Sequence, residues 1–211
     1  MRGLVRVGAA VPSLALGNVK ENMKRHLAMM REAKEKHVSI VTFPELSLTG
    51  YTCGDLFFQR RLLDDVTDAL LALKDEMPEG ILAVVGAPLE IEGALYNCAV
   101  VLHKGEIISA VPKTFLPNNG EFYEKRWFQS GDARRDASVA IPKLKTDVCR
   151  QAIFEMEDGV RFGIELCEDL WAPLPPSTML SVEGAEIILN LSASNELLSK
   201  REYRQQLISQ Q

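Results

Sequence analysis

The sequence lacks the features that mark several large classes of protein. Its 211 residues carry 24 basic and 29 acidic side chains, which gives a formal net charge of -5. A nucleic-acid backbone demands a basic surface, so this balance argues against nucleic acid as a partner. No apolar run approaches the length that a bilayer-spanning helix needs, so we expect no membrane partner either.

The cysteine and glycine patterns exclude further kinds of site. No pair among the four cysteines has the Cys-x-x-Cys spacing that is typical of zinc sites, so we expect no metal and no cofactor in this domain. No glycine-rich phosphate loop occurs, which excludes ATP binding by that route. The four cysteines are Cys53, Cys98, Cys149 and Cys167.

The N-terminus combines a basic residue, apolar residues and small residues, as a signal peptide does. Arg6 interrupts the apolar run, and the alternation from Leu4 to Ala9 favours a buried first strand instead. Without an export signal, reduced thiols and a cytoplasmic location are expected.

Short apolar runs alternate with amphipathic stretches, which indicates a layered α/β fold in one domain over residues 1–211. Asn18 is a candidate cap for a helix that runs to about His37, and the β-branched run 38–43 predicts a buried strand. Further elements are expected as a helix from Asp55 to Pro78, strands over 81–88 and 95–112, a hairpin turning at 158–159, a strand over 186–192 and a helix from Asn195.

Two segments depart from this regular pattern. Residues 113–145 replace periodic apolar residues with prolines, asparagines, aromatics and charges, which is typical of functional or mobile segments. The chain ends inside its last predicted helix without a capping glycine or proline, so we expect a domain that is incomplete at its C-terminus. Missing strands would leave an exposed sheet edge, which predicts a homo-oligomer.

Three polar residues follow predicted buried strands directly. These residues are Glu45, Lys113 and Cys167. Ligands bind at the carboxyl ends of strands in α/β layers, and a thiol, a carboxyl group and an ammonium group suit attack on an amide. Taken singly, each residue equally fits a structural role as a core thiol, a helix-start carboxylate or a strand-end charge.

The segments around these three residues resemble, in order, the signature segments of the nitrilase superfamily. The segments are FPELSLTGY, PKTFLPNNGEFYEKRWF and GIELCEDLW. The resemblance extends over essentially the whole chain, and it implies an αββα sandwich with a catalytic triad of Glu45, Lys113 and Cys167. It also implies a supporting glutamate after the lysine, for which Glu121 is the best match and Glu124 its competitor.

Other segments, CEDLWAPLPPS and NLSASNELLSKREYR, are similar to the glutaminase domain of glutamine-dependent NAD synthetases. This similarity implies that the chain hydrolyses glutamine through a thioester. The ammonia would pass to a synthetase domain, absent from this chain, that uses ATP and Mg to make NAD from nicotinic acid adenine dinucleotide. Ser194 and Lys200 match substrate-contacting positions, Asn119 stands where the family often has a tyrosine, and Glu168 and Tyr51 are further pocket candidates.

Two alternatives stay open at this point. One is a free-standing nitrilase-like amidase that acts on another small amide, which the reading frame beyond Gln211 would distinguish. The other is a catalytically silent module that keeps the fold, which the presence of all three triad residues disfavours.

Overall fold

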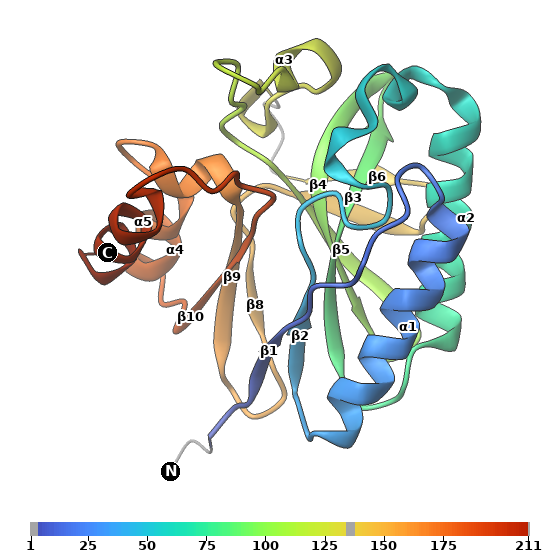
Figure 1. Cartoon of the computed structure of the whole chain (residues 1–211). Coiled ribbons are helices and arrows are strands. Elements are labelled where there is room, and N and C mark those ends of the chain that lie inside the picture. Colours follow the sequence, from blue (N-terminus) through green and yellow to red (C-terminus); the bar gives the residue numbers. More distant parts are fainter. Residues whose placement is uncertain (1–3, 134–137, 211) are drawn as a thin grey trace.

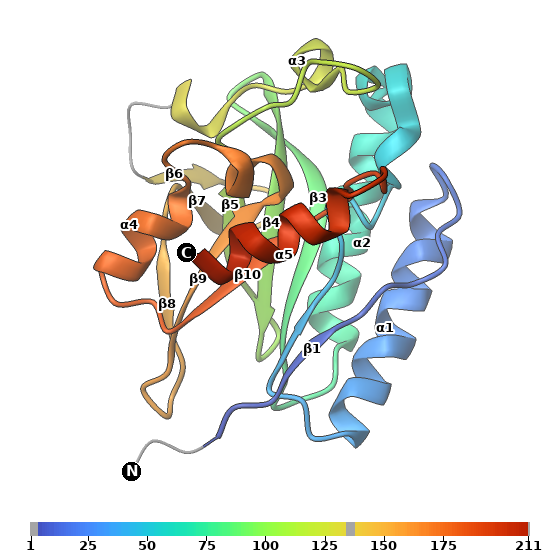
Figure 2. The same ribbon diagram turned by 60° about the vertical axis from the view of Figure 1, so that its left-hand side comes forward.

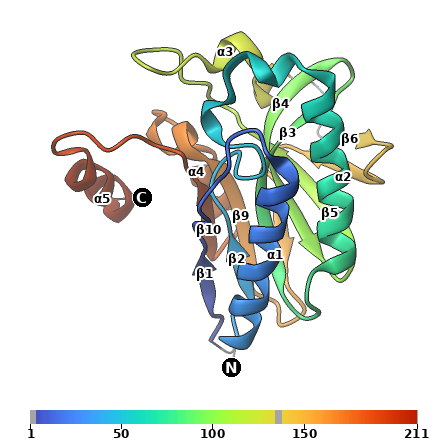
Figure 3. The same ribbon diagram turned by 45° about the vertical axis from the view of Figure 1, so that its right-hand side comes forward.

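Two β-sheets pack face to face in the computed structural model, which describes residues 4–133 and 138–210, and helices cover the outer face of each sheet (Figure 1). The larger sheet has the strand order β1-β2-β3-β4-β5-β7-β6, and the smaller sheet has the order β10-β9-β8. The helix α5 lies on the side of the smaller sheet, away from α1 and α2 (Figures 2 and 3). This arrangement confirms the expected αββα sandwich.

The larger sheet contains β1 (Val7–Ala9), β2 (Ile40–Thr42), β3 (Leu82–Ile91), β4 (Ala94–His103), β5 (Glu106–Pro112), β6 (Ser138–Ile141) and β7 (Thr146–Cys149). The smaller sheet contains β8 (Ile153–Glu155), β9 (Arg161–Leu166) and β10 (Ile187–Leu191). The α-helices are α1 (Val19–Glu35), α2 (Arg60–Glu76), α3 (Glu124–Trp127), α4 (Pro176–Val182) and α5 (Lys200–Gln210). Three 3₁₀ segments are η1 (Tyr51–Phe58), η2 (Gly131–Ala133) and η3 (Cys167–Trp171).

Alternating side chains give the larger sheet a separate core on each face. Ile40 belongs to the core between the two sheets, which includes Phe162 of β9. Its neighbour Val41 belongs to the core beneath the helices, which includes Leu70 of α2. Successive strand residues point to opposite faces, so both faces of β2 are buried. Each fully buried aliphatic or aromatic side chain stabilises the fold by about 1.5–3 kcal/mol.

Several expected elements appear as predicted. The side chain of Asn18 accepts a hydrogen bond from the backbone of Glu21 at 3.1 Å and caps α1. The strands β8 and β9 form the expected antiparallel hairpin. The irregular segment 113–145 contains α3, η2 and β6, while its residues 134–137 lie outside the described part. Among the residues that the structure describes, no helix is both long and apolar enough to cross a membrane.

Three expectations about element positions were wrong. The first strand lies at the edge of the larger sheet, where Val7 is exposed, because β1 pairs only with β2 among the described strands. The second helix begins at Arg60 and not at Asp55, which lies in the 3₁₀ segment η1. The final helix begins at Lys200 and not at Asn195. Alternation and capping patterns identify elements better than they locate their ends.

Candidate active site

Three strand ends bring together the acid, the amine and the thiol that the sequence singled out. Glu45 follows β2 and Lys113 follows β5, and these strands run in the same direction within the larger sheet. Cys167 follows β9 of the smaller sheet, which packs against the larger one. The three residues are only 1%, 1% and 6% exposed, respectively. The site therefore lies between the two sheets.

A buried ammonium group bridges two carboxylates at this position. Lys113 Nζ donates to Glu45 Oε1 and to Glu124 Oε1, each at 2.6 Å. Glu45 Oε1 also accepts from Asn97 Nδ2 at 2.8 Å, and Glu45 Oε2 accepts from the backbone N–H of Ala193 at 3.1 Å. Because both Glu45 oxygens have fixed donors, the orientation of this carboxylate is set by its surroundings.

The structure places Glu124, and not Glu121, beside the lysine. Glu124 is 1% exposed, and its Oε1 also accepts a hydrogen bond from Tyr51 Oη at 2.6 Å. Glu121 is exposed and contacts the side chain of Asn195. The sequence favoured Glu121 as the supporting glutamate, but the structure places Glu124 beside the lysine instead. The one-turn helix α3 begins at Glu124 and directs that side chain inward.

Cys167 occupies a backbone conformation that is unusual for a residue with a side chain. Its φ is +42°, in the left-handed region, which costs such a residue about 1–2 kcal/mol. Burial, and after it the nearby Glu45, raise the pKa of its thiol to about 12. Lys113 and hydrogen bonds from the Ala193 backbone and Ser192 partly oppose these effects. At neutral pH, the group at rest is therefore a thiol that needs a base to become a nucleophile.

The ionisable groups around the thiol shift one another's pKa values. Burial disfavours the ammonium form of Lys113, but Glu45 and Glu124 outweigh burial and raise the lysine pKa. Burial also raises the pKa of Glu124, although Lys113 and Tyr51 act in the opposite direction. Burial and the neighbouring Glu124 raise the pKa of Tyr51, so this residue remains a phenol and a donor. The lysine accordingly stays positive at neutral pH.

A glycine in the neighbouring strand makes room for the segment that carries Glu45. A Cβ added at Gly86 of β3 would lie only 2.4 Å from the carbonyl oxygen of Pro44 and from the nitrogen of Leu46. The N–H of Leu48 donates to the carbonyl of Gly86 at 3.1 Å. The close approach of these two backbones requires glycine at position 86.

Helix α1 fixes the same segment from its other side. Asn22 Nδ2 donates to the carbonyl of Leu48 at 3.0 Å. Burial lowers the pKa of His26 to about 4, so the ring is neutral at pH 7. Its Nδ1 lies 2.7 Å from the Asn22 carbonyl and must carry the proton, which leaves Nε2 to accept from Ser47 Oγ at 2.9 Å. In the sequence, Asn22 and His26 are polar residues on the apolar face of a predicted helix, and this pattern indicates such a network.

The predicted substrate-binding residues occupy different surroundings. Ser194 and Lys200 are partly buried, and Lys200 Nζ lies 5.4 Å above the ring of Trp171. Glu168 lines a cavity of about 440 Å³ that also includes Trp171. Asn119 is exposed in the loop before α3. Tyr51 contacts the site through Glu124, so its hydroxyl is already engaged.

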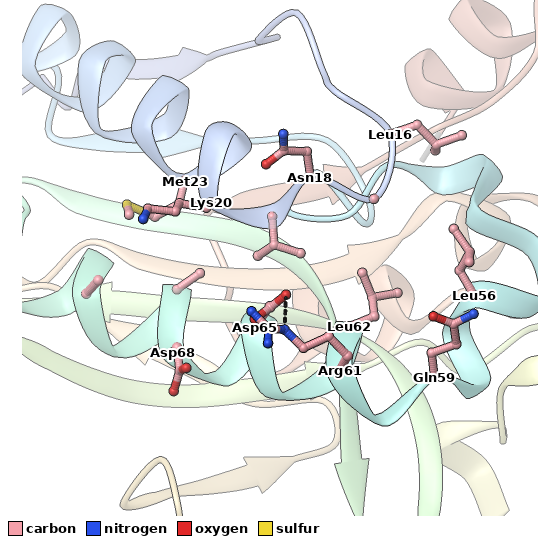
Figure 4. A pocket seen from close by; sticks show the side chains of 14 residues that line it. Leu16, Asn18, Lys20, Met23, Leu56, Gln59, Arg61, Leu62, Asp65 and Asp68 are labelled. Atoms are coloured by element: carbon pink, nitrogen blue, oxygen red, sulfur yellow. Dashed lines mark hydrogen bonds and ion pairs between the residues drawn. The ribbon is translucent and has the colours of Figure 1, made fainter.

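A second hollow, of about 800 Å³, lies between the first turns of α1 and α2 (Figure 4). Leucines such as Leu62 line it, together with the ion pair of Arg61 and Asp65 at 2.9 Å. No thiol, hydroxyl or imidazole side chain lines it. Within residues 4–133 and 138–210, no group of three or more His, Cys, Asp or Glu side chains could hold a metal ion.

Comparisons with known proteins place this geometry in a family. The glutamine-dependent NAD(+) synthetase of Mycobacterium bovis is 36% identical over 208 residues, which are 97% of this chain and 30% of that protein. A crystal structure of a glutamine-dependent NAD(+) synthetase from Cytophaga hutchinsonii is similar with a TM-score of 0.83 and 29% identity, over 97% of this chain and 33% of that one. The amidase from Nesterenkonia sp. has the same fold, with a TM-score of 0.72 and 17% identity over 92% of this chain and 67% of that one.

The chain spans about 30% of the length of the curated relatives that it matches. The family model for carbon-nitrogen hydrolases matches residues 6–211, nearly all of the sequence. The chain belongs to the carbon-nitrogen hydrolase family.

Proposed function

We propose that this chain hydrolyses the side-chain amide of glutamine, with Cys167 as nucleophile, Glu45 as general acid and base, and Lys113 as the stabiliser of the oxyanion. One observation carries the proposal: a buried ammonium lies 2.6 Å from each of two carboxylates, Glu45 and Glu124, beside a buried thiol. These are the groups that amide hydrolysis through a covalent intermediate requires.

In the first step, Glu45 takes the proton of the Cys167 thiol, and the sulfur attacks the amide carbon of glutamine. The proton moves from one buried group to another, so the net charge of the cluster does not change. This is important because uncompensated charge in a buried site is costly. The carbonyl oxygen becomes an oxyanion, which the ammonium group of Lys113 stabilises.

In the second step, the carbon–nitrogen bond breaks while Glu45 returns the proton to the departing nitrogen. Ammonia leaves, and the glutamyl group stays on Cys167 as a thioester. A water molecule then gives a proton to Glu45 and attacks the thioester carbon, which releases glutamate and restores the thiol as the proton returns to sulfur. Glu124 holds the lysine throughout by a second hydrogen bond.

The charged groups near the site suit an amino acid as substrate. We assign the α-amino group of glutamine to Glu168, and its α-carboxylate to Lys200 and Ser194. The partial burial of all three residues leaves them open to a ligand. A cation and a carboxylate that both bind the α-carbon end of the substrate would distinguish glutamine from simple amides.

The names of the curated relatives support a role for the ammonia. Those proteins are glutamine-dependent NAD(+) synthetases, and the chain matches about 30% of their length. We propose that ammonia passes to an ATP- and Mg-dependent domain, which attaches it to adenylylated nicotinic acid adenine dinucleotide. Ammonia itself would be the attacking amine at that second site.

Release of glutamate from glutamine tests the assignment of the nucleophile. Cys167→Ala should lower kcat by about 10⁴-fold or more, because no neighbouring group replaces the thiolate. Cys98→Ala is the matched control, since Cys98 is a fully buried thiol of β4 that lies in the helix-side core. The control should keep kcat within about twofold, because the nucleophile is intact. Equal losses in both variants, or an active Cys167→Ala, would contradict the assignment.

The ammonia role needs this chain together with its synthetase partner domain. There, Cys167→Ala should stop NAD formation from glutamine and leave NAD formation from ammonium salts intact. A variant that loses both activities would assign Cys167 to folding or assembly instead.

A further inference from the structure

We propose that Asp169 is a positioning residue that holds Cys167 and Lys113 at a fixed separation across the two sheets. The inference deepens the proposed function of the site and rests on it for one of its two tests. It starts from a buried carboxylate that the proposed chemistry does not use.

The Asp169 carboxylate connects the two sheets through backbone hydrogen bonds. Its Oδ1 accepts from the N–H of Phe115 at 2.7 Å and from the N–H of Thr114 at 3.1 Å. Its Oδ2 accepts from the N–H of Leu166 at 3.0 Å. Thr114 and Phe115 directly follow Lys113, and Leu166 directly precedes Cys167. One side chain therefore ties the backbone at the lysine to the backbone at the nucleophile.

Local structure explains only half of this arrangement. The bond from Leu166 is a short-range contact at the start of the 3₁₀ segment η3, where an acidic side chain commonly satisfies a free N–H. The bonds from Thr114 and Phe115 cross 55 and 54 residues of sequence, and capping of η3 does not require them. Their consequence is a fixed distance between two segments that belong to different sheets.

A carboxylate is the group that this position requires. Both oxygens of Asp169 face N–H donors, and both accept when the carboxyl group is ionised, as it is above its pKa of about 7. An asparagine has the same shape but only one accepting oxygen, and its NH₂ group would face one of the N–H donors. Asparagine would therefore release either the lysine segment or the cysteine segment. With 1% exposure, Asp169 leaves little space for water to restore the lost bond.

The first test compares Asp169→Asn with a variant that is destabilised elsewhere. Asp169→Asn should lower kcat for glutamine hydrolysis by about 10- to 100-fold, because small displacements of reacting groups have effects of that size. KM should change by less than about twofold, since the proposed substrate contacts are intact. Leu70→Ala, in the core beneath α2, is the control: it should lose stability and keep kcat.

The second test does not depend on turnover. Iodoacetamide labelling of Cys167 should slow by about 10-fold in Asp169→Asn at a fixed pH, because the lysine no longer favours the thiolate at its usual distance. Labelling of Cys149, a half-buried thiol in β7, serves as an internal reference and should not change. Unchanged kcat and unchanged Cys167 labelling in a folded Asp169→Asn would overturn the proposal, and so would the same two losses in Leu70→Ala.

Hydrogen exchange of the unsubstituted chain covers the case in which Asp169→Asn does not fold. The amides of Thr114, Phe115 and Leu166 should be protected together and lose protection in one opening event. Fast exchange at Thr114 and Phe115 with slow exchange at Leu166 would show that Asp169 serves only the local turn. An active Cys167→Ala would remove the proposed nucleophile and yet leave this exchange result unaffected, so the two failures are distinguishable.

Discussion

The two sheets contribute to the site in different ways. The larger sheet supplies Glu45, Lys113 and Asn97, which form one buried hydrogen-bond network. The smaller sheet supplies Cys167, which has a left-handed backbone conformation. Burial raises the pKa of its thiol to about 12. Glu45 and Lys113 are thus fixed within one sheet, whereas the position of Cys167, the proposed nucleophile, depends on how the two sheets pack.

Few polar contacts make that connection. The Ala193 backbone donates to Glu45, and Asp169 accepts from the segment after Lys113. Apolar packing adds to these contacts, through residues such as Ile40 and Phe162 in the core between the sheets. Changes within the larger sheet should therefore destroy the charge network, and changes in the contacts between sheets should alter its alignment with the thiol.

Among changes to the larger sheet, the largest expected effect comes from removing the buried cation. Lys113→Met leaves Glu45 and Glu124 without their shared partner, and breaking a buried ion pair costs about 3–5 kcal/mol of stability. kcat should fall by about 10²- to 10³-fold as oxyanion stabilisation is lost. Chemical denaturation and glutamate release measure the two effects.

A second substitution sharpens this result. Adding Glu124→Gln to Lys113→Met removes one unpaired carboxylate and should recover part of the lost stability without recovering activity. Additive losses in the double variant would contradict the shared network, since groups in one network are coupled.

Two glycines, one in each sheet, offer a matched comparison. A Cβ at Gly86 would meet backbone atoms beside Glu45 at 2.4 Å, whereas a Cβ at Gly163 of β9 would meet the side chain of Leu180 at 2.8 Å. Overpacking costs about 1–3 kcal/mol, and a flexible side chain moves more easily than backbone. Gly86→Ala should therefore lose more stability and more activity than Gly163→Ala, as thermal unfolding and turnover can measure. The reverse order would contradict the role assigned to the Glu45 segment.

Stability should depend on pH through the carboxylate that joins the sheets. Burial raises the pKa of Asp169 to about 7, although backbone hydrogen bonds and Lys113 act in the opposite direction and Glu165 adds to the rise. Between about pH 4 and pH 7, the unfolded chain loses this proton and the folded chain retains it. Folding should therefore lose up to about 1.4 kcal/mol per pH unit as the pH rises through this range.

Asp169→Asn has no such proton and should show a flatter profile than the unsubstituted chain. Urea unfolding at a series of pH values measures the difference between the two curves. Burial also raises the pKa of Glu124, but the contribution of Glu124 to the pH dependence of stability is present in both proteins and cancels in the comparison. Parallel profiles would show that Asp169 is ionised in the folded chain over the whole range.

The smallest effect is expected at the edge of the charge network. Tyr51→Phe removes the hydroxyl that donates to Glu124 at 2.6 Å, and the loss of one such bond costs about 1–3 kcal/mol. Activity should fall only a few-fold, because Lys113 keeps both carboxylates. A loss as large as that of Lys113→Met would instead place Tyr51 in direct contact with the reacting groups.

Strand-end positions and local sequence were the basis on which the sequence singled out Glu45, Lys113 and Cys167. Glu45, Lys113 and Cys167 each follow an apolar run, and a run of that kind indicates that a strand is present more clearly than where the strand lies in a sheet. The same limit explains β1, whose alternation was real but whose edge position, with Val7 exposed, was not predicted. A local sequence pattern does not show whether a strand has a neighbouring strand on one side or on both sides.

The supporting residues depend on contacts that are distant in sequence. Asp169 bonds to Phe115, 54 residues away, and Asn97 bonds to Glu45, 52 residues away. The choice between Glu121 and Glu124 depended on where a single helical turn begins, which spacing alone does not determine. The sequence therefore singled out Glu45, Lys113 and Cys167, and the structure was needed to show which residues position them.

The central claim is that the thiol of Cys167 attacks the glutamine amide beside the charge network of the other sheet. Rapid acid quenching of the chain during turnover, followed by peptide mass analysis, tests this directly. The account predicts one glutamyl group on the peptide that contains Cys167 and none on the peptides with Cys53, Cys98 or Cys149. Turnover of glutamine with an unmodified Cys167 peptide, or a glutamyl group on another residue, would contradict it.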